Sequence, residues 1–189
     1  MLGIDGLGNL TGTPGREWEL DRLFASIAHL TRFYPGFELW FWSKVVPGLG
    51  QGSRRIFPMY VGKSLAAISI LKRVPGEHKI CTLWVAPFAR RLGLGTNVLR
   101  NSSTWLECDK PLITVCEERF HELQPLLRKF GFTLEEISNS HYRPGRSEYA
   151  FNGLMSHSQV SCQKIDCTAL HLNERATGTL CLPSGRSDF

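Results

Sequence analysis

Apolar residues follow two different spacings along the chain. Residues 17–33 place Leu20, Leu23, Phe24, Ile27 and Leu30 on one helical stripe, which predicts an amphipathic helix. Residues 37–46 predict a second, shorter helix that ends at Pro47 and Gly48. We therefore expect two helices to open the fold.

From Arg54 the spacing becomes that of strands. Residues 56–61, 65–71 and 80–85 are short β-rich runs separated by Gly62-Lys63 and Pro75-Gly76. Runs of this kind with turn residues between them predict an antiparallel meander of three strands.

The next segments alternate between the two patterns. A helix is predicted after Gly95 and strands at 111–115, 132–137 and 148–151. Another helix stripe lies between residues 120 and 130, where Pro125 predicts that the helix begins near Gln124 or bends there. This order predicts an α/β fold with a mixed, mostly antiparallel central sheet flanked by helices in a single domain.

The sheet-forming pattern stops near residue 152. Residues 16–152 are the predicted domain, and residues 153–189 are rich in serine and threonine without a sustained period. We expect this C-terminal extension to be flexible or loosely packed. Its cysteines and histidines have irregular spacing and no CxxC pair, so no metal site is expected.

Charge and composition narrow the class of protein. The formal net charge is +5, and residues 153–189 hold three basic and three acidic residues, so the whole excess lies in the first part. A basic domain attracts phosphate-bearing partners of any kind, from a cofactor to RNA. The apolar runs are too short to cross a bilayer, and the first residues do not resemble a secretory signal, so we expect a cytoplasmic protein without membrane contact.

The segment from Leu83 to Thr96 joins a predicted strand to a predicted helix. Gly93 and Gly95 let the backbone approach a ligand closely, and the free N–H groups at a helix start point outward. Such a turn binds anions, and Arg90 and Arg91 add positive charge beside it. A pyrophosphate would suit this turn.

Val85, Pro87, Arg90, Gly93 and Gly95 resemble the cofactor motif of the GNAT acyl-CoA-dependent N-acetyltransferases. The resemblance covers about residues 16–152. It implies acetyl-CoA as co-substrate, with pyrophosphate on the motif's amides and pantetheine along the preceding strand. The cofactor-binding residues that it implies are Leu83, Trp84, Val85, Arg90, Arg91, Leu92, Gly93, Leu94, Gly95 and Thr96.

Two other phosphate-binding motifs are excluded. Gly62-Lys63-Ser64 ends like a P-loop, but Phe57 stands where the first glycine belongs. A dinucleotide-binding fold needs a third glycine where Val98 stands and an early βαβ unit, which the predicted order lacks.

At two positions the expected catalytic groups differ from those of the family. Lys79 stands where some family members carry a basic glutamate, and Glu77 is the nearest substitute on the same strand face. Leu127 stands where the family often has a tyrosine acid. Tyr142 is our preferred acid, with Tyr149, Cys116 and a mechanism without a dedicated acid as alternatives.

An aromatic stretch predicts the acceptor side. Trp40, Phe41 and Trp42 are consecutive, and consecutive helical residues point about 100° apart, so all three cannot face one core. Trp40 and Trp42 are therefore candidate substrate-binding residues.

The leading interpretation is an N-acetyltransferase that moves an acetyl group from acetyl-CoA to a primary amine by direct attack in a ternary complex. The alternatives are a non-enzymatic acyl-CoA-binding module and a toxin-like acetyltransferase acting on aminoacyl-tRNA. The oligomeric state is left open.

Overall fold

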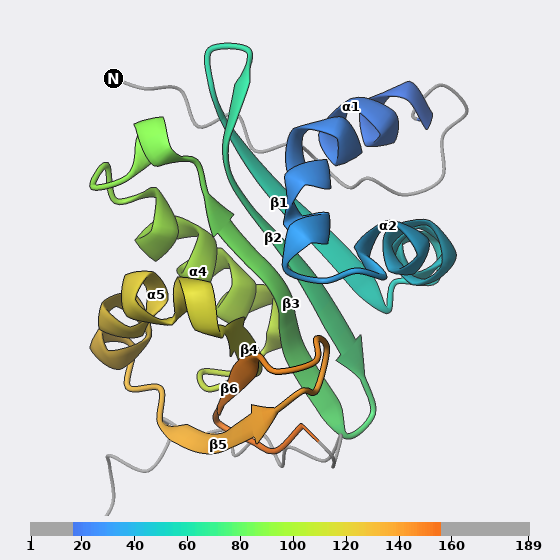
Figure 1. Cartoon of the computed structure of the whole chain (residues 1–189). Helices are drawn as coiled ribbons and strands as arrows, with labels where there is room; N and C mark the ends of the chain where they lie inside the picture. The colour runs from blue at the N-terminus through green and yellow to red at the C-terminus, as the bar shows by residue number, and fades with distance from the viewer. Residues whose placement is uncertain (1–16, 156–189) are drawn as a thin grey trace, which may run out of the picture.

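The computed structural model describes residues 17–155, which form a six-stranded sheet with helices on both faces (Figure 1). The strand order is β1-β2-β3-β4-β6-β5, and every neighbouring pair is antiparallel except β3 and β4. The predicted mixed, mostly antiparallel sheet is confirmed. The strands are β1 Arg54–Val61, β2 Ser64–Val74, β3 Glu77–Val85, β4 Leu112–Cys116, β5 Leu134–Asn139 and β6 Ser147–Phe151.

The helices fall where the apolar stripes predict them, with two corrections. α1 (Glu17–Ile27) continues as a 3₁₀ turn, η1 (Ala28–Arg32). α2 (Phe37–Trp40) passes through a π segment, η2 (Phe41–Val45), into α3 (Val46–Gly50). The predicted stop at Pro47 is wrong, because the helical run continues through this proline to Gly50, directly after a π segment that changes the hydrogen-bond spacing of the backbone.

The second correction concerns Pro125. α4 (Leu94–Leu106) follows a short 3₁₀ turn, η3 (Pro87–Ala89), and α5 runs from Glu117 to Lys129 with Pro125 inside it. A start near Gln124 is therefore wrong. The apolar stripe that includes Leu123 and Leu127, both buried, holds the helix on the sheet through the proline.

The sheet separates two apolar cores. Side chains alternate along β2, so Ile68 and Ile70 face the core under α1 and α2, whereas Ala67 and Leu71 face the core under α4 and α5. Figure 1 shows these two helix pairs on opposite sides of the strands.

Two irregularities in β3 open the middle of the sheet. The parallel ladder between β3 and β4 has only the pairs Lys79–Leu112 and Ile80–Ile113. Between β2 and β3 the register shifts where Ile70 pairs with Thr82 and Leu71 with Ile80, so Cys81 is the extra residue of a β-bulge. Beyond the bulge, β3 separates from β4, and the two strands splay apart.

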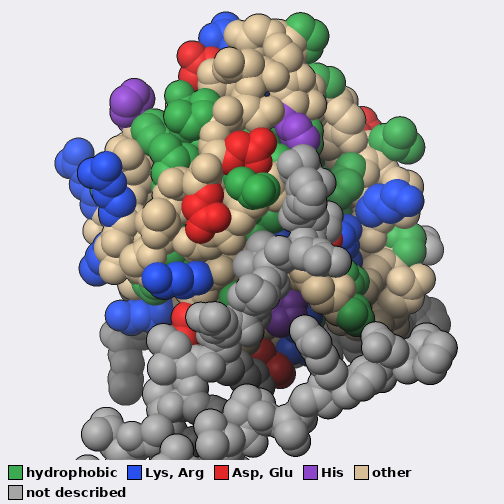
Figure 2. All heavy atoms as spheres, turned by 90° about the horizontal axis from the view of Figure 1, so that it is seen from below, with side chains coloured by type: hydrophobic (Ala, Val, Ile, Leu, Met, Phe, Trp, Pro, Cys, Tyr) green, Lys and Arg blue, Asp and Glu red, His purple; other side chains and the backbone are tan. Residues whose placement is uncertain are grey.

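The β5 edge of the sheet closes the described fold. Leu134 and Ile137 are exposed there beside Glu135 and Glu136. Figure 2, which looks at this end of the molecule, shows apolar side chains scattered among charged ones. Charged residues on an edge strand discourage pairing with another chain. Within residues 17–155, none of the helices combines the length and apolarity needed to span a bilayer.

Candidate functional site

The loop before α4 has the backbone of an anion-binding turn. Arg91 and Gly93 have φ angles of 63° and 77°, and Gly93 is the N-cap of α4 without a side-chain cap. The Asn97 N–H donates the first hydrogen bond of the helix to the Gly93 carbonyl, 3.1 Å. The N–H groups of Leu94, Gly95 and Thr96 precede it and have no acceptor within the helix. They supply the positive end of the helix dipole to an anion.

The two glycines of the loop are needed for different reasons: Gly95 for close packing and Gly93 for its backbone conformation. A Cβ on Gly95 would stand 3.2 Å from Leu126 Cδ2 and 3.6 Å from Val85 Cγ2, so its absence lets α4 lie close to β3 and α5. A Cβ on Gly93 would meet nothing within 4 Å. Gly93 is therefore required for its left-handed backbone and faces open space, where a ligand can approach.

The arginines of the loop point to different partners. Arg90 forms an ion pair with Glu122 of α5 (3.1 Å), and Arg119 reaches the same carboxylate at 2.8 Å. Arg91 and Leu92 are exposed, and Arg91 forms no ion pair within residues 17–155. Arg90 thus fixes the loop to α5, and Arg91 remains available to a ligand.

The splay between β3 and β4 holds a small cavity of about 40 Å³. Leu83 and Trp84 line it from β3, and Ile113 and Cys116 line it from β4. Val85 lies outside it and packs against both apolar cores. Past Ile80, β3 has no ladder partner in β4, so its backbone groups on this edge are available to an extended ligand.

A larger pocket of about 390 Å³ lies next to the splay cavity on the α1–α2 face. Five residues line both spaces, so the two are contiguous: Tyr34, Phe37, Cys81, Thr82 and Thr114. The rest of the larger pocket is lined by Pro35, Gly36, Trp40, Arg54, Lys72, Glu77, Lys79 and Tyr142. We call it the acceptor pocket.

The two tryptophan candidates are placed differently. Trp40 lines the acceptor pocket, with its ring 5.5 Å from that of Phe37. Trp42 lines none of the described pockets and packs against Phe24 and Phe41, with ring centroids 5.7 Å and 5.1 Å away. Of the two tryptophans, only Trp40 lines this pocket.

Tyr34 stands at the boundary of the two spaces and donates a hydrogen bond to Glu148 Oε1 of β6, 3.1 Å. Glu148 is buried, and burial raises its pKa to about 7. Burial, and then the charge of Glu148, raises the pKa of Tyr34 well above its usual range. The pair therefore combines a neutral phenol in the pocket wall with a carboxyl that changes charge near neutral pH.

Cys116 lies beside this pair. It is buried at the end of β4, opposite Glu148 in the strand register. Burial raises the pKa of its thiol to about 11, with the charge of Glu148 as the next cause. The thiol therefore stays protonated at neutral pH.

Tyr142 lies at the mouth of the acceptor pocket, in the loop between β5 and β6. Its ring meets that of Tyr34 edge-on, with centroids 5.4 Å apart. The neighbouring Arg143 holds this loop with a two-pronged ion pair to Glu118 of α5 (2.9 and 2.6 Å), which lowers the pKa of Glu118 to about 2. The ion pair between Arg143 and Glu118, which does not line the pocket, thus holds Tyr142 against Tyr34.

Glu77 also lines the acceptor pocket. It is buried and forms an ion pair with Lys72 of β2. Lys79 lies on the same strand face, and Cys81 follows in the bulge. The structure therefore brings Glu77, Tyr142 and Trp40 into one pocket, and joins that pocket to Leu83 and Trp84.

Reasoning from the sequence missed Tyr34, Glu148 and Arg54. Glu148 carries one local signal: it alternates with Ala150 on the inward face of β6, an unusual place for a carboxyl. Tyr34 and Arg54 carry none, because Tyr34 gains its place when the loop before α2 meets β6, and Arg54 gains its place from the pairing of β1 with β2. Among residues 17–155 no cluster of metal-ligating side chains is present; the cysteines and histidines of the extension lie outside this range.

No protein-family model and no curated protein matches the chain. Among solved structures it is similar to an acetyltransferase assigned to the GNAT family from Desulfovibrio desulfuricans (15% identity, 52% of this chain and 68% of the other, TM-score 0.46). It is also similar to an acetyltransferase from Bacillus subtilis in complex with CoA (16%, 53% and 76%, 0.44). A third is the ribosomal-protein-S18-alanine N-acetyltransferase from Escherichia coli (18%, 60% and 74%, 0.46). At these identities and TM-scores, the chemistry of this chain has to be read from its own side chains.

Proposed function

We propose that this protein is an acetyl-CoA-dependent N-acetyltransferase that transfers the acetyl group directly to a primary amine. One observation supports it above the others: the anion-binding turn of α4, the free edge of β3 and the acceptor pocket adjoin one another. Acetyl-CoA has a pyrophosphate for the turn and an amide-containing arm for the strand edge. The thioester would then lie where Tyr34 and Thr114 separate the two spaces.

In the proposed reaction the amine nitrogen attacks the thioester carbonyl carbon. The C–N bond forms, the C–S bond breaks, the amine loses one proton and the departing thiolate gains one. When bound, acetyl-CoA supplies the activated acyl group, and the residues of the chain position the two reactants and move the protons.

Glu148 and Tyr34 are the groups we propose to take the amine proton. Tyr34 contacts the pocket and Glu148 does not, so the amine proton would pass to the Tyr34 oxygen as the Tyr34 proton passes to Glu148 Oε1. This requires an ionised Glu148, and its pKa of about 7 permits that at neutral pH. The other phenol of the pocket, Tyr142, is our proposed proton donor to the thiolate.

Glu77 is a less favourable base in this arrangement. Its carboxylate is already paired with Lys72, whereas Glu148 has a neutral phenol as its partner. Lys72 therefore occupies a carboxylate oxygen of Glu77 that the amine would have to reach.

The test is binding and turnover in the same preparation. Acetyl-CoA should raise the melting temperature, because a ligand specific for the native state stabilises it by about 2.7 kcal/mol at one hundred times its Kd. Gly93→Glu should abolish the rise by placing bulk and negative charge in the open space above α4. Gly62→Glu is the matched control, with a φ of 60°, nothing within 4 Å and a place at the β1–β2 hairpin.

Turnover is then followed as thiol release with a panel of amines. Release that depends on an amine supports the enzyme. If acetyl-CoA binds but no amine in the panel causes thiol release, the protein is better described as an acyl-CoA-binding module. Equal binding by the Gly93→Glu and Gly62→Glu variants would contradict the cofactor site.

A further inference from the structure

The acceptor pocket contains a row of positive charges on neighbouring strands. Arg54 of β1 is paired with Lys72 of β2, and Lys72 is paired with Lys79 of β3. Residues directly opposite one another in antiparallel strands share a sheet face, so the three side chains lie side by side. All three line the acceptor pocket. We call them the cation row.

Like charges directly opposite one another destabilise a sheet, and the row is only partly neutralised. Glu77 is the one carboxylate that lines the pocket, and it is paired with Lys72. Within residues 17–155 neither Arg54 nor Lys79 has a carboxylate oxygen within 4.0 Å. Two cations of the row, Arg54 and Lys79, therefore line the pocket without a direct ion pair, and the carboxyl that acts on Lys79 at longer range is the buried Glu148.

The Arg54 guanidinium is oriented by its neighbours but keeps unused hydrogen-bond donors. Its Nη1 donates to Cys81 Sγ at 3.2 Å, and its Cζ lies 5.8 Å from the centre of the Trp40 ring. Sulfur is a weak acceptor, and a guanidinium has five N–H donors in a planar fork that matches a carboxylate. The bulge at Cys81 and the Trp40 ring thus orient a fork that has donors to spare.

We infer that the acceptor is a small primary amine that also carries a carboxylate, as an amino acid does. This rests on the proposed function, because it names the acceptor of that reaction. The carboxylate would bind Arg54 and Lys79, and the amine would face Tyr34 and Thr114 at the boundary with the splay cavity. A pocket of about 390 Å³ suits a molecule of that size. The same charges repel polyamines, which lack a negative group.

The experiment separates recognition of the acid from turnover. Calorimetry on the full chain saturated with CoA, which cannot donate an acetyl group, measures matched pairs that differ by one carboxylate: phenylalanine and phenethylamine, leucine and isoamylamine, lysine and cadaverine. We expect the acid of at least one pair to bind tenfold or more tightly than its partner. Arg54→Gln and Lys79→Gln should each reduce that ratio several-fold.

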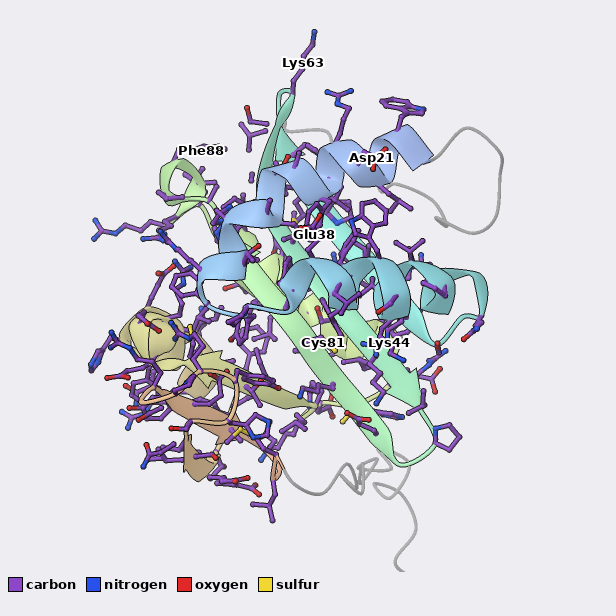
Figure 3. The ribbon with its side chains drawn as sticks, turned by 45° about the vertical axis from the view of Figure 1, so that its right-hand side comes forward. Asp21, Glu38, Lys44, Lys63, Cys81 and Phe88 are labelled. Atoms are coloured by element: carbon purple, nitrogen blue, oxygen red, sulfur yellow. The ribbon has the colours of Figure 1, made fainter. Side chains whose placement is uncertain are left out.

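Lys63→Gln is the matched control, because it also removes one positive charge. Figure 3 shows Lys63 at the tip of the β1–β2 hairpin, away from Cys81. It should leave the ratio unchanged. The melting temperature of each variant is measured alongside. Relief of repulsion across the strands opposes the loss of the Arg54 contacts with Cys81 and Trp40, so we expect little change, and a ratio lost at an unchanged melting temperature does not come from unfolding.

Turnover with acetyl-CoA then distinguishes the two hypotheses. If acids bind tightly but are never acetylated, the proposed function is contradicted, whereas the carboxylate site at Arg54 and Lys79 is supported. If amines are acetylated equally well with and without a carboxylate, the inference is overturned, whereas the proposed acetyl transfer is supported. The inference would also be overturned if no acid bound more tightly than its partner amine. The same holds if Arg54→Gln and Lys79→Gln left the preference for the acid unchanged.

Discussion

The two halves of the site are built in different ways. On the proposed cofactor side, the backbone presents the candidate binding groups: the N–H groups at the start of α4 and the unpaired edge of β3 beyond Ile80. On the acceptor side, side chains from five elements converge, and Tyr34 meets a glutamate 114 residues away. Binding by backbone suits a ligand with one fixed shape, whereas specificity for an amine depends on side chains.

This difference decides how far the sequence could predict each half. The loop from Arg90 to Thr96 is contiguous, and glycines at 93 and 95 have a direct physical meaning, so the turn could be found without a structure. The sheet was predictable for the same reason, because apolar alternation and turn residues are local signals.

The acceptor side could not be predicted in this way. The cation row depends on the register of three strands, and the sequence does not give the register. The neighbouring Trp40 and Trp42 look alike in sequence, and the packing of Phe24 against Trp42 decides between them. A bulge at Cys81 was likewise unpredictable, since no glycine marks it.

Glu148→Gln should have the largest effect on the acceptor half. We expect kcat to fall about 10²- to 10³-fold, as when a general base is lost. In the parent, activity should rise as the pH rises through about 7, because only the ionised carboxylate accepts a proton. The activity of Glu148→Gln should not show this rise near pH 7. The measurement is a pH profile of kcat at saturating acetyl-CoA and amine.

Stability provides the control for this variant. The pKa of Glu148 is raised in the native state, so the native protein binds more protons than the unfolded chain between about pH 4.5 and 7. The free energy of unfolding therefore loses a contribution as the pH rises through that window. Glu148→Gln should abolish that loss, so a kcat reduced alongside a lower melting temperature at pH 8 would contradict the catalytic role. Glu77→Gln reducing kcat more than Glu148→Gln would reassign the base.

The tryptophan pair tests whether the two halves are energetically separate. Trp40→Ala should raise the KM for the amine about tenfold and leave that for acetyl-CoA nearly unchanged, because Trp40 lines only the acceptor pocket. Trp42→Ala should lower the melting temperature with little change in either KM, because its ring packs on Phe24 and Phe41. Equal changes in both KM values for Trp40→Ala would mean that it only supports the fold.

The smallest expected effect concerns the loop that carries Tyr142. Arg143 ties this loop to Glu118, and its Nη1 also donates to the Arg32 carbonyl at 3.4 Å. Arg143→Gln should cost about 1 kcal/mol or less of stability at pH 7, since an ion pair at the protein surface contributes little. It should also raise the KM for the amine two- to five-fold, by freeing Tyr142 from its position against Tyr34.

The pH dependence identifies the ion pair as the cause. The pKa of Glu118 is lowered to about 2, so its contribution is present above about pH 4.5 and is lost as the pH falls toward 2. The stabilities of parent and variant should therefore converge between pH 4 and pH 2, as unfolding in urea would measure. Arg146→Gln is the comparison, because its contacts with Glu117 and Glu118 are 3.9 and 4.0 Å long and should contribute less. If Arg146→Gln raised the amine KM as much as Arg143→Gln, the general positive charge of the loop, and not the clamp on Glu118, would be holding Tyr142 in the acceptor half.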